Sequence, residues 1–202
     1  NLLKEKASTK QKVYKITKNI FSKLQELLKE KAIRLNTEIA DDDVTISYLE
    51  SGDFDAKLTF SGETLLFHMH TNIFEFEQSH PIHKTSYVQQ DKMRSFCGVI
   101  NIYNFLSDSL KYNRLNDAGF LIARVFINKD YHFFVEGEQE LGFLFNEFIH
   151  QKINTDQMNN IINSCMEYAL HFDLEIPNFN DVKIVSIHEI LDINNNHKLK
   201  TS

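Results

Sequence analysis

A helical repeat of apolar residues near the start of the chain restricts the fold more than any other feature. The repeat lies within residues 10–35 and consists of Val13, Ile16, Ile20, Leu24, Leu27 and Leu28. Its steps of three and four residues predict one long amphipathic helix, because residues so spaced lie on the same side of an α-helix. Such a helix must bury its apolar stripe against a sheet, another helix or a partner.

The same segment is basic, whereas the rest of the chain is acidic. Residues 1–34 contain ten Lys or Arg and three Glu, a formal charge of +7, and the whole chain has −6, so the remainder carries −13. A solvated, lysine-rich helix face explains this asymmetry, and so does a helix that docks on an acidic surface of this chain or of a partner. In the partner case the candidate partner-binding residues are Val13, Ile16, Ile20, Leu24 and Leu27.

Charge, apolar runs and cysteines indicate which ligands and which cellular location to expect for the chain. We do not expect nucleic-acid binding, because the acidic body would repel phosphate and Arg34 is the only arginine in the basic segment. We expect no membrane span, since no stretch approaches the roughly 20 apolar residues that one needs. Cys97 and Cys165 lie among apolar residues, which favours buried free thiols over a disulfide or a catalytic thiol. With no recognisable signal peptide, we expect a cytoplasmic location.

Residues 44–77 have the pattern of strands separated by turns. We expect strands over 44–51, 56–60 and 64–77, with turns at 51–55 and 61–63 that contain Gly and Asp or Glu. In the last of these strands Phe67 and Met69 share one parity, whereas Phe74 and Phe76 have the other. The facing therefore changes near Asn72, which predicts a bulge or a tight bend there.

The second half of the chain alternates between helical and strand patterns. We expect a helix over 91–115, a hairpin of strands 120–127 and 131–138, a helix over 156–172 and a last short helix over 181–193. Together these elements predict an α+β fold in which a mostly antiparallel sheet packs against helices, in the order helix–strands–helix–hairpin–helix.

The predicted elements divide the chain into three parts. They are a long basic amphipathic helix (1–35), an α+β core domain (36–176) and a C-terminal extension (177–202) whose last residues we expect to be disordered. With 202 residues, 42% of them hydrophobic, the chain is long enough to bury a sizeable core.

Two histidines and a glutamate form a candidate metal site. His68, His70 and Glu75 follow Gly62 with the spacing of the first half of the first cupin motif, whose histidines and glutamate are metal ligands. On a strand, alternate residues share a face about 6.6 Å apart, so two imidazoles can converge on one ion. A carboxylate beyond a bend can then supply a third ligand. This resemblance implies a cupin-like, metal-dependent enzyme that holds a divalent metal.

The same stretch also fits an ordinary strand with one wet face. Ile82 stands where the cupin pattern has a glycine, and the second motif of that family has no counterpart in this chain. His68 and His70 then simply face solvent, opposite Phe67 and Met69, as polar residues of antiparallel sheets often do. In this interpretation the chain needs no cofactor. The sequence also contains no phosphate-binding glycine loop, CxxC, nucleophile elbow or HExxH.

Residues 102–171 resemble a known family of proteins. The stretches are "IYNFLSDSLKYNRLNDAGFLIARVFINKDYHFFVEGE" and "INTDQMNNIINSCMEYALHF". They are similar to the YbjN-like family and the related type III secretion chaperone-like fold. In that family an amphipathic helix ends near an Asn, a hairpin with a polar turn follows, and a Thr-x-x-Gln-like cap opens the next helix. Asn113, residues 128–130, and Thr155 with Met158 occupy these places.

This resemblance implies a non-enzymatic, protein-binding or chaperone-like module, homodimeric in many members. We therefore expect a protein partner or a second copy of the chain, with neither nucleic acid nor membrane. The alternative function is the cupin-like metal-dependent enzyme that uses His68, His70 and Glu75.

Overall fold

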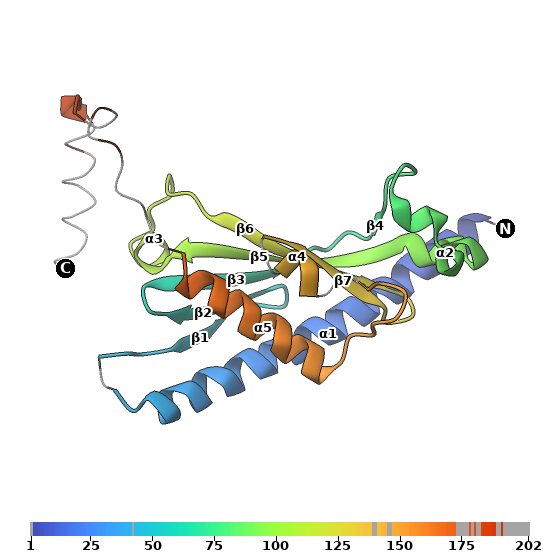
Figure 1. Cartoon of the computed structure of the whole chain (residues 1–202), viewed down its shortest axis with the longest axis horizontal. Coiled ribbons are helices and arrows are strands. Elements are labelled where there is room, and N and C mark those ends of the chain that lie inside the picture. Colours follow the sequence, from blue (N-terminus) through green and yellow to red (C-terminus); the bar gives the residue numbers. More distant parts are fainter. Residues whose placement is uncertain are drawn as a thin grey trace.

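One antiparallel sheet forms the centre of the molecule, and two helices cover one of its faces (Figure 1). The structure, a computed structural model, describes residues 2–41, 43–138, 141–144, 147–172, 178, 180, 183–188 and 191. Within these residues the sheet has seven strands, and helices α1 (Leu2–Ile39) and α5 (Thr155–Leu170) pack on it. The predicted α+β class with a mostly antiparallel sheet is therefore confirmed.

The sheet is a meander of neighbouring strands. Its strands are β1 (Ser47–Glu50), β2 (Asp55–Phe60), β3 (Glu63–Met69), β4 (Phe74–Glu75), β5 (Phe96–Leu106), β6 (Phe120–Asn128) and β7 (Phe133–Gly137). Their order is β1-β2-β3-β5-β6-β7, and β4 pairs with β5 next to the end of β3. The short helical turns are η1 (Pro81–Lys84), α2 (Ser86–Gln90), η2 (Lys92–Ser95), α3 (Ser107–Lys111) and α4 (Leu141–Leu144).

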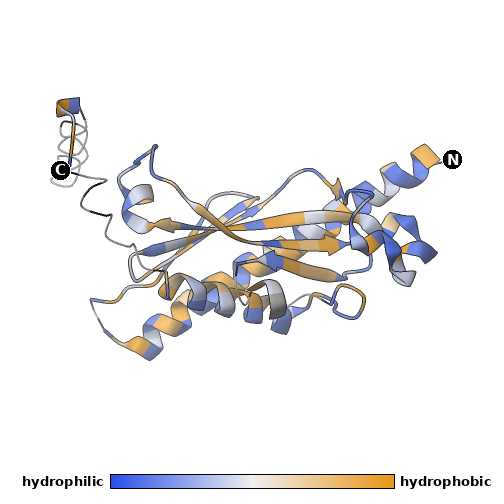
Figure 2. Ribbon diagram, turned by 45° about the horizontal axis from the view of Figure 1, so that its top comes forward, coloured by the Kyte–Doolittle hydropathy of each residue, from blue (hydrophilic) through white to orange (hydrophobic). Residues whose placement is uncertain are grey.

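Helix α1 buries its apolar stripe against the sheet of the same chain. It runs along the sheet, with its N-terminal end beside α2 (Figure 1), and hydrophobic and hydrophilic residues alternate along it (Figure 2). The residues predicted to bind a partner are at most 8% exposed; they are Val13, Ile16, Ile20, Leu24 and Leu27. In this arrangement the five side chains are buried within the chain itself, and binding of a partner by them stays a prediction. The boundary predicted at residue 35 falls within α1, which shares one hydrophobic core with the sheet.

The strands contribute to the main core the side chains that point toward the helices. Phe67 and Met69 of β3 are fully buried, and Ile100 and Ile102 of β5 are 2% exposed or less. The register pairs Phe67 with Ile102 and Met69 with Ile100, so these four side chains lie on the same face. Helix α5 contacts β3 and α1 and adds its own apolar stripe to this core. The main core therefore lies between the sheet and the two helices.

The helix predicted over residues 91–115 is wrong. A short 3₁₀ turn, the long strand β5 and the short helix α3 occupy this segment instead. The first half of β5 is buried on both faces, because a second, smaller core covers Cys97 and Val99 while the main core covers Ile100. A strand buried on both faces has a continuous apolar run, which contains apolar residues at helical spacing as well.

Two of the other elements predicted in the second half of the chain are confirmed. The predicted hairpin is confirmed as β6 and β7, and the predicted helix 156–172 is confirmed as α5. Asn154 caps α5: its side chain accepts a hydrogen bond from the backbone N–H of Gln157 at 2.8 Å. The last predicted helix and the predicted disordered tail fall largely outside the described residues.

Candidate binding face of the sheet

The face of the sheet that α1 and α5 leave uncovered carries side chains in transverse rows. Because neighbouring strands pair in register, residues opposite each other on successive strands line up across the sheet. One such line, the apolar row, consists of Leu49, Lys57, Leu66, Tyr103 and Leu121. The next line, the polar row, consists of Asp55, His68, Asn101, Arg124 and Glu136. We call this side of the sheet the open face.

The apolar row exposes large side chains to solvent. Leu49 on β1 is 58% exposed and Leu121 on β6 is 42% exposed, while Leu66 and Tyr103 between them are half-buried. The aliphatic stem of Lys57 can lie along the same row, because lysine buries its methylene groups while its ammonium stays in water. The row crosses five strands, and its four apolar side chains line up across the sheet with Lys57 between Leu49 and Leu66.

The polar row forms side-chain pairs between adjacent strands. The Nδ1 atom of His68 lies 2.7 Å from Oδ1 of Asp55. The Nε atom of Arg124 donates a 2.7 Å hydrogen bond to Oε2 of Glu136. All four side chains are more than one-third exposed, so these pairs orient the row more than they stabilise the fold.

A groove of about 740 Å³ opens on the open face beside the polar row. Asn101, Arg124 and Glu136 of the polar row form one border, and residues 74–81 form the opposite wall. Val99, Phe126 and Phe134 form the floor between them. The wall exists because β4 pairs with β5, with Phe74 opposite Cys97, and carries the following loop over the sheet.

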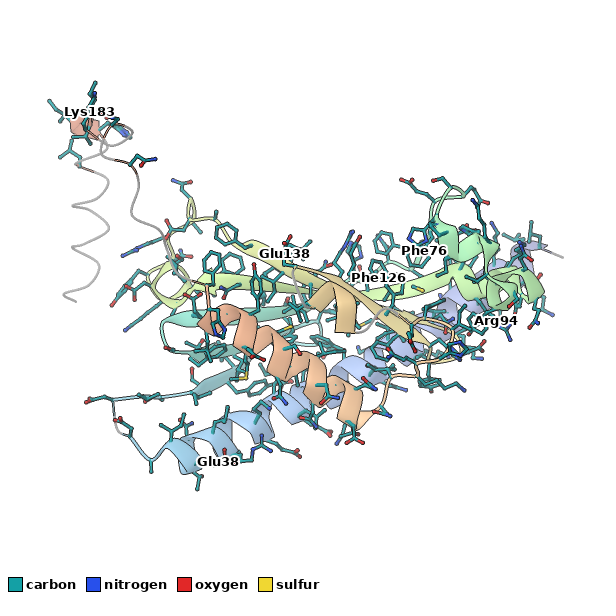
Figure 3. The ribbon with its side chains drawn as sticks, viewed as in Figure 1. Glu38, Phe76, Arg94, Phe126, Glu138 and Lys183 are labelled. Carbon is teal, nitrogen blue, oxygen red and sulfur yellow. The ribbon has the colours of Figure 1, made fainter. Side chains whose placement is uncertain are left out.

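Aromatic rings cluster at the floor of the groove. The rings of Phe126 and Phe134 stack with centroids 4.7 Å apart, and Phe76 lies 5.3 Å from Phe126 and 5.5 Å from Phe134. Figure 3 shows Phe76 and Phe126 next to one another on the side of the sheet away from α5. The ring of His80 stacks on Phe76 with centroids 4.8 Å apart. These contacts give the groove a rigid apolar base.

A partly buried polar network holds residues 86–95, the segment that follows the wall of the groove. The hydroxyl of Tyr87 donates to Asp130 at 3.1 Å and accepts from Nδ2 of Asn128 at 3.1 Å. Arg94 pairs with the same carboxylate at 3.0 Å and lies over the ring of Tyr87. Burial, which is the largest cause, raises the pKa of Tyr87 to about 12. The network therefore fixes residues 86–95 to the turn between β6 and β7.

The three predicted metal ligands lie on this face or at its edge, but they do not form a metal site. The side chains of His68 and His70 lie on the face opposite Phe67 and Met69, as the alternation predicted. The chain bends between β3 and β4, also as predicted. Nevertheless, within the described residues no three His, Cys, Asp or Glu side chains are grouped so that they could hold a metal.

Each predicted ligand has another contact. His68 pairs with Asp55, and Nδ1 of His70 accepts a 3.0 Å hydrogen bond from the backbone N–H of Asn72. The carboxylate of Glu75 lies 3.8 Å from Nζ of Lys6 on α1. The sequence did not reveal Asp55 as the partner of His68, because that contact depends on the register between β2 and β3.

The two cysteines are buried free thiols, as predicted. Cys97 and Cys165 are fully buried and form no disulfide with each other. Burial raises the pKa of both thiols, so the reactive thiolate is disfavoured in each. Although Cys97 lines the groove, its sulfur is covered by the residues around it. Neither cysteine has the properties of a nucleophile.

Among the helices that the structure describes, none has the length and apolar composition that crossing a membrane requires. Comparison of the chain with protein-family models, with curated proteins and with solved structures finds no match.

Proposed function

We propose that this chain is a protein-binding module that receives its partner on the open face of the sheet. The observation that carries the proposal is the apolar row, in which Leu49 and Leu121 expose 58% and 42% of their surface. Large apolar side chains that are aligned on an exposed face and rimmed by polar residues are typical of an interaction surface. The polar row beside it supplies charged groups that can set the orientation of a partner.

The size of the apolar row suits a protein segment better than a small substrate. From β1 to β6 the row spans four strand spacings, which is about 19 Å at roughly 4.8 Å per spacing. A helix or an extended segment of a partner can follow a strip of this length across the strands. The partner is a protein with an apolar segment, and in a homodimer it is a second copy of this chain.

The resemblance to the YbjN-like and type III secretion chaperone-like proteins supports the same proposal. Members of that fold group hold an antiparallel sheet against helices and bind partner proteins, often as dimers. This chain departs from the pattern before Asn113, where strand β5 replaces the expected long amphipathic helix. The resemblance therefore adds a chaperone-like role to the proposal without specifying the surface that is used.

Metal-dependent catalysis by His68, His70 and Glu75 has less support than protein binding. All three side chains make polar contacts with other residues: His68 with Asp55, His70 with the backbone of Asn72, and Glu75 with Lys6. Because no observation of the geometry favours an ion between these residues, we do not propose this function.

Site-specific photo-cross-linking tests the proposal. p-Benzoylphenylalanine is placed at Tyr103 in the apolar row and, as a control, at the exposed Lys29 on α1. We expect Tyr103 to cross-link to one polypeptide in an extract of the source cell and Lys29 not to. A cross-linked product of twice the chain mass with purified protein would identify a second copy as the partner. Equal cross-linking from both positions, or none from Tyr103, would contradict the proposal.

Substitutions in the apolar row then test whether the captured partner binds there. In the purified complex, L49D or L121D should weaken binding about tenfold or more, because each places an unpaired charge in an apolar interface. S22D on the exposed side of α1 adds the same charge far from the row and should leave the affinity unchanged. An affinity that is the same in all three variants would show that the partner binds elsewhere.

A further inference from the structure

The groove beside the polar row combines aromatic rings with an excess of negative charge. Its lining contains three carboxylates, Glu75, Glu77 and Glu136, and one guanidinium, that of Arg124. With neutral histidines the lining has a formal charge of −2. A concave apolar site with one sign of charge attracts ligands of the opposite sign more strongly than a flat surface does.

The three carboxylates differ in whether a basic side chain of the same protein already pairs with them. Glu136 is paired with Arg124, and Glu75 lies 3.8 Å from Lys6. The carboxylate of Glu77 accepts a 3.5 Å hydrogen bond from the hydroxyl of Ser79, and the structure shows no ion-pair partner for it within the described residues. Glu77 is also exposed. It is therefore the carboxylate of the groove that is best placed to pair with a cation from a ligand.

The aromatic floor favours a cation as well. Ring faces carry negative charge and attract guanidinium and ammonium groups within about 6 Å of their centroids. Phe126 already has such a contact, since the guanidinium carbon of Arg124 lies 5.5 Å from its centroid. Phe76 and Phe134 are half-buried, so part of each ring remains available to a ligand.

We infer that this groove binds a basic, apolar segment of the partner protein. In this arrangement an Arg or Lys side chain of the segment pairs with Glu77, and an adjacent apolar side chain packs on Phe76 and Phe134. A volume of about 740 Å³ lies within the range of roughly 300–1,000 Å³ typical of ligand sites, so it can hold several side chains. The inference rests on the proposed function and specifies the kind of segment that the open face accepts.

Peptide binding to the full chain tests this inference. The probe is a fluorescein-labelled peptide of alternating Arg and Leu, and the matched control is the same peptide with Glu in place of Arg. We expect fluorescence anisotropy to show binding of the Arg peptide, weakening as salt is added, and no binding of the Glu peptide. Equal binding of both peptides, or no binding of the Arg peptide, would overturn the inference.

Variants locate the binding to the groove. E77Q should weaken binding of the Arg peptide about three- to fivefold, as expected for one partly exposed charge pair, and E77K should weaken it further. E167Q and E167K change the charge equally at an exposed site on α5, on the other side of the sheet, and should leave binding unchanged. If E77K binds the peptide as well as the unmodified protein does, the groove is not the site.

The two proposals fail in different experiments. A partner that cross-links to Tyr103 while the Arg peptide does not bind would leave the open face as an interface and refute only the basic segment. Peptide binding that depends on Glu77 without any cross-link at Tyr103 would instead refute the role of the apolar row.

Discussion

At the scale of single residues, Gly98 shows how closely α1 approaches the sheet. A Cβ atom at this position would lie 2.0 Å from Oγ1 and 2.8 Å from Cβ of Thr17. Thr17 is fully buried on α1, and its hydroxyl donates a 2.9 Å hydrogen bond to the carbonyl of Val13. The threonine therefore has no room to move away, and glycine is required where the helix crosses β5.

We expect G98A to destabilise the protein by about 1–3 kcal/mol, the usual cost of overpacking a core. Urea unfolding measures the change. T17A removes the two outer atoms of the threonine side chain, so the double variant T17A/G98A should recover part of the loss. If G98A is as stable as the parent protein, α1 does not cross the sheet at this point.

Tyr87 gives the stability a dependence on high pH. Its pKa is raised to about 12 in the folded protein, chiefly by burial, whereas an unfolded tyrosine has a pKa of about 10. Between these values the unfolded chain loses the proton more readily, so unfolding releases a proton and stability falls as pH rises. Below about pH 10 this contribution is fully present.

Urea unfolding at about pH 9 and about pH 11 should therefore show a smaller loss of stability in Y87F than in the parent protein. The loss should decrease rather than disappear, because burial also raises the pKa values of Tyr48 and Tyr168. At neutral pH Y87F should itself be less stable, since Asp130 and Asn128 lose their hydrogen bonds to the hydroxyl. If Y87F loses as much stability between the two pH values as the parent protein does, Tyr87 is not a cause of the loss.

At the scale of elements, strand β3 could be predicted from the sequence, whereas β5 could not. One face of β3 lies in the core and the other is partly exposed, so Phe67 and Met69 alternate visibly with His68 and His70. The first half of β5 lacks this contrast, because residues 96–100 are all buried. The spacing of apolar residues in such a segment fits a helix as well as a strand. Only the β-branched residues Val99, Ile100 and Ile102 favour a strand.

This difference also determined how much of the candidate site could be predicted. The outward orientation of His68 and His70 follows from alternation within one strand. The apolar row, the polar row and the groove depend on pairing between strands, and β5 contributes Tyr103, Asn101 and Val99 to them. With residues 91–115 predicted as a helix, no arrangement of rows could be derived from the sequence.

Helix α1 packs on the sheet and contributes a continuous stripe of buried side chains to the main core, so its removal should unfold the chain. A protein that lacks residues 1–35 loses all the buried apolar side chains of α1 and exposes the facing side of β2, β3 and β5. We expect the truncated chain to show no cooperative thermal transition by circular dichroism. The matched control is a full-length chain with K12Q, K15Q and K29Q, which alters exposed lysines of α1 and should still unfold cooperatively. A truncated protein with a native transition would show that α1 is dispensable.

At the scale of the whole molecule, part of the charge asymmetry is satisfied within the chain. Lysines of α1 pair with acidic residues of the sheet region: Lys18 lies 2.7 Å from Asp53, and Lys6 lies 3.8 Å from Glu75. The basic helix thus docks on the acidic body of its own chain, one of the alternatives that the sequence left open. Because both α1 and α5 pack on the same face, the part of the opposite face that the second core does not cover remains for a partner.

The two cores share the central strands, so they should unfold together. Cys97 belongs to the second core on the open face, and Cys165 of α5 belongs to the main core. Since both thiols are fully buried and burial raises their pKa values, neither should react with Ellman's reagent until the chain unfolds. The variant C165A keeps only Cys97 and reports the second core, and C97A keeps only Cys165 and reports the main core. After correction for any change in stability, the two thiols should react at the same slow rate. Faster reaction of Cys97 would show that the loop over the groove opens without global unfolding, and rapid reaction of Cys165 would contradict the packing of α5 on the sheet.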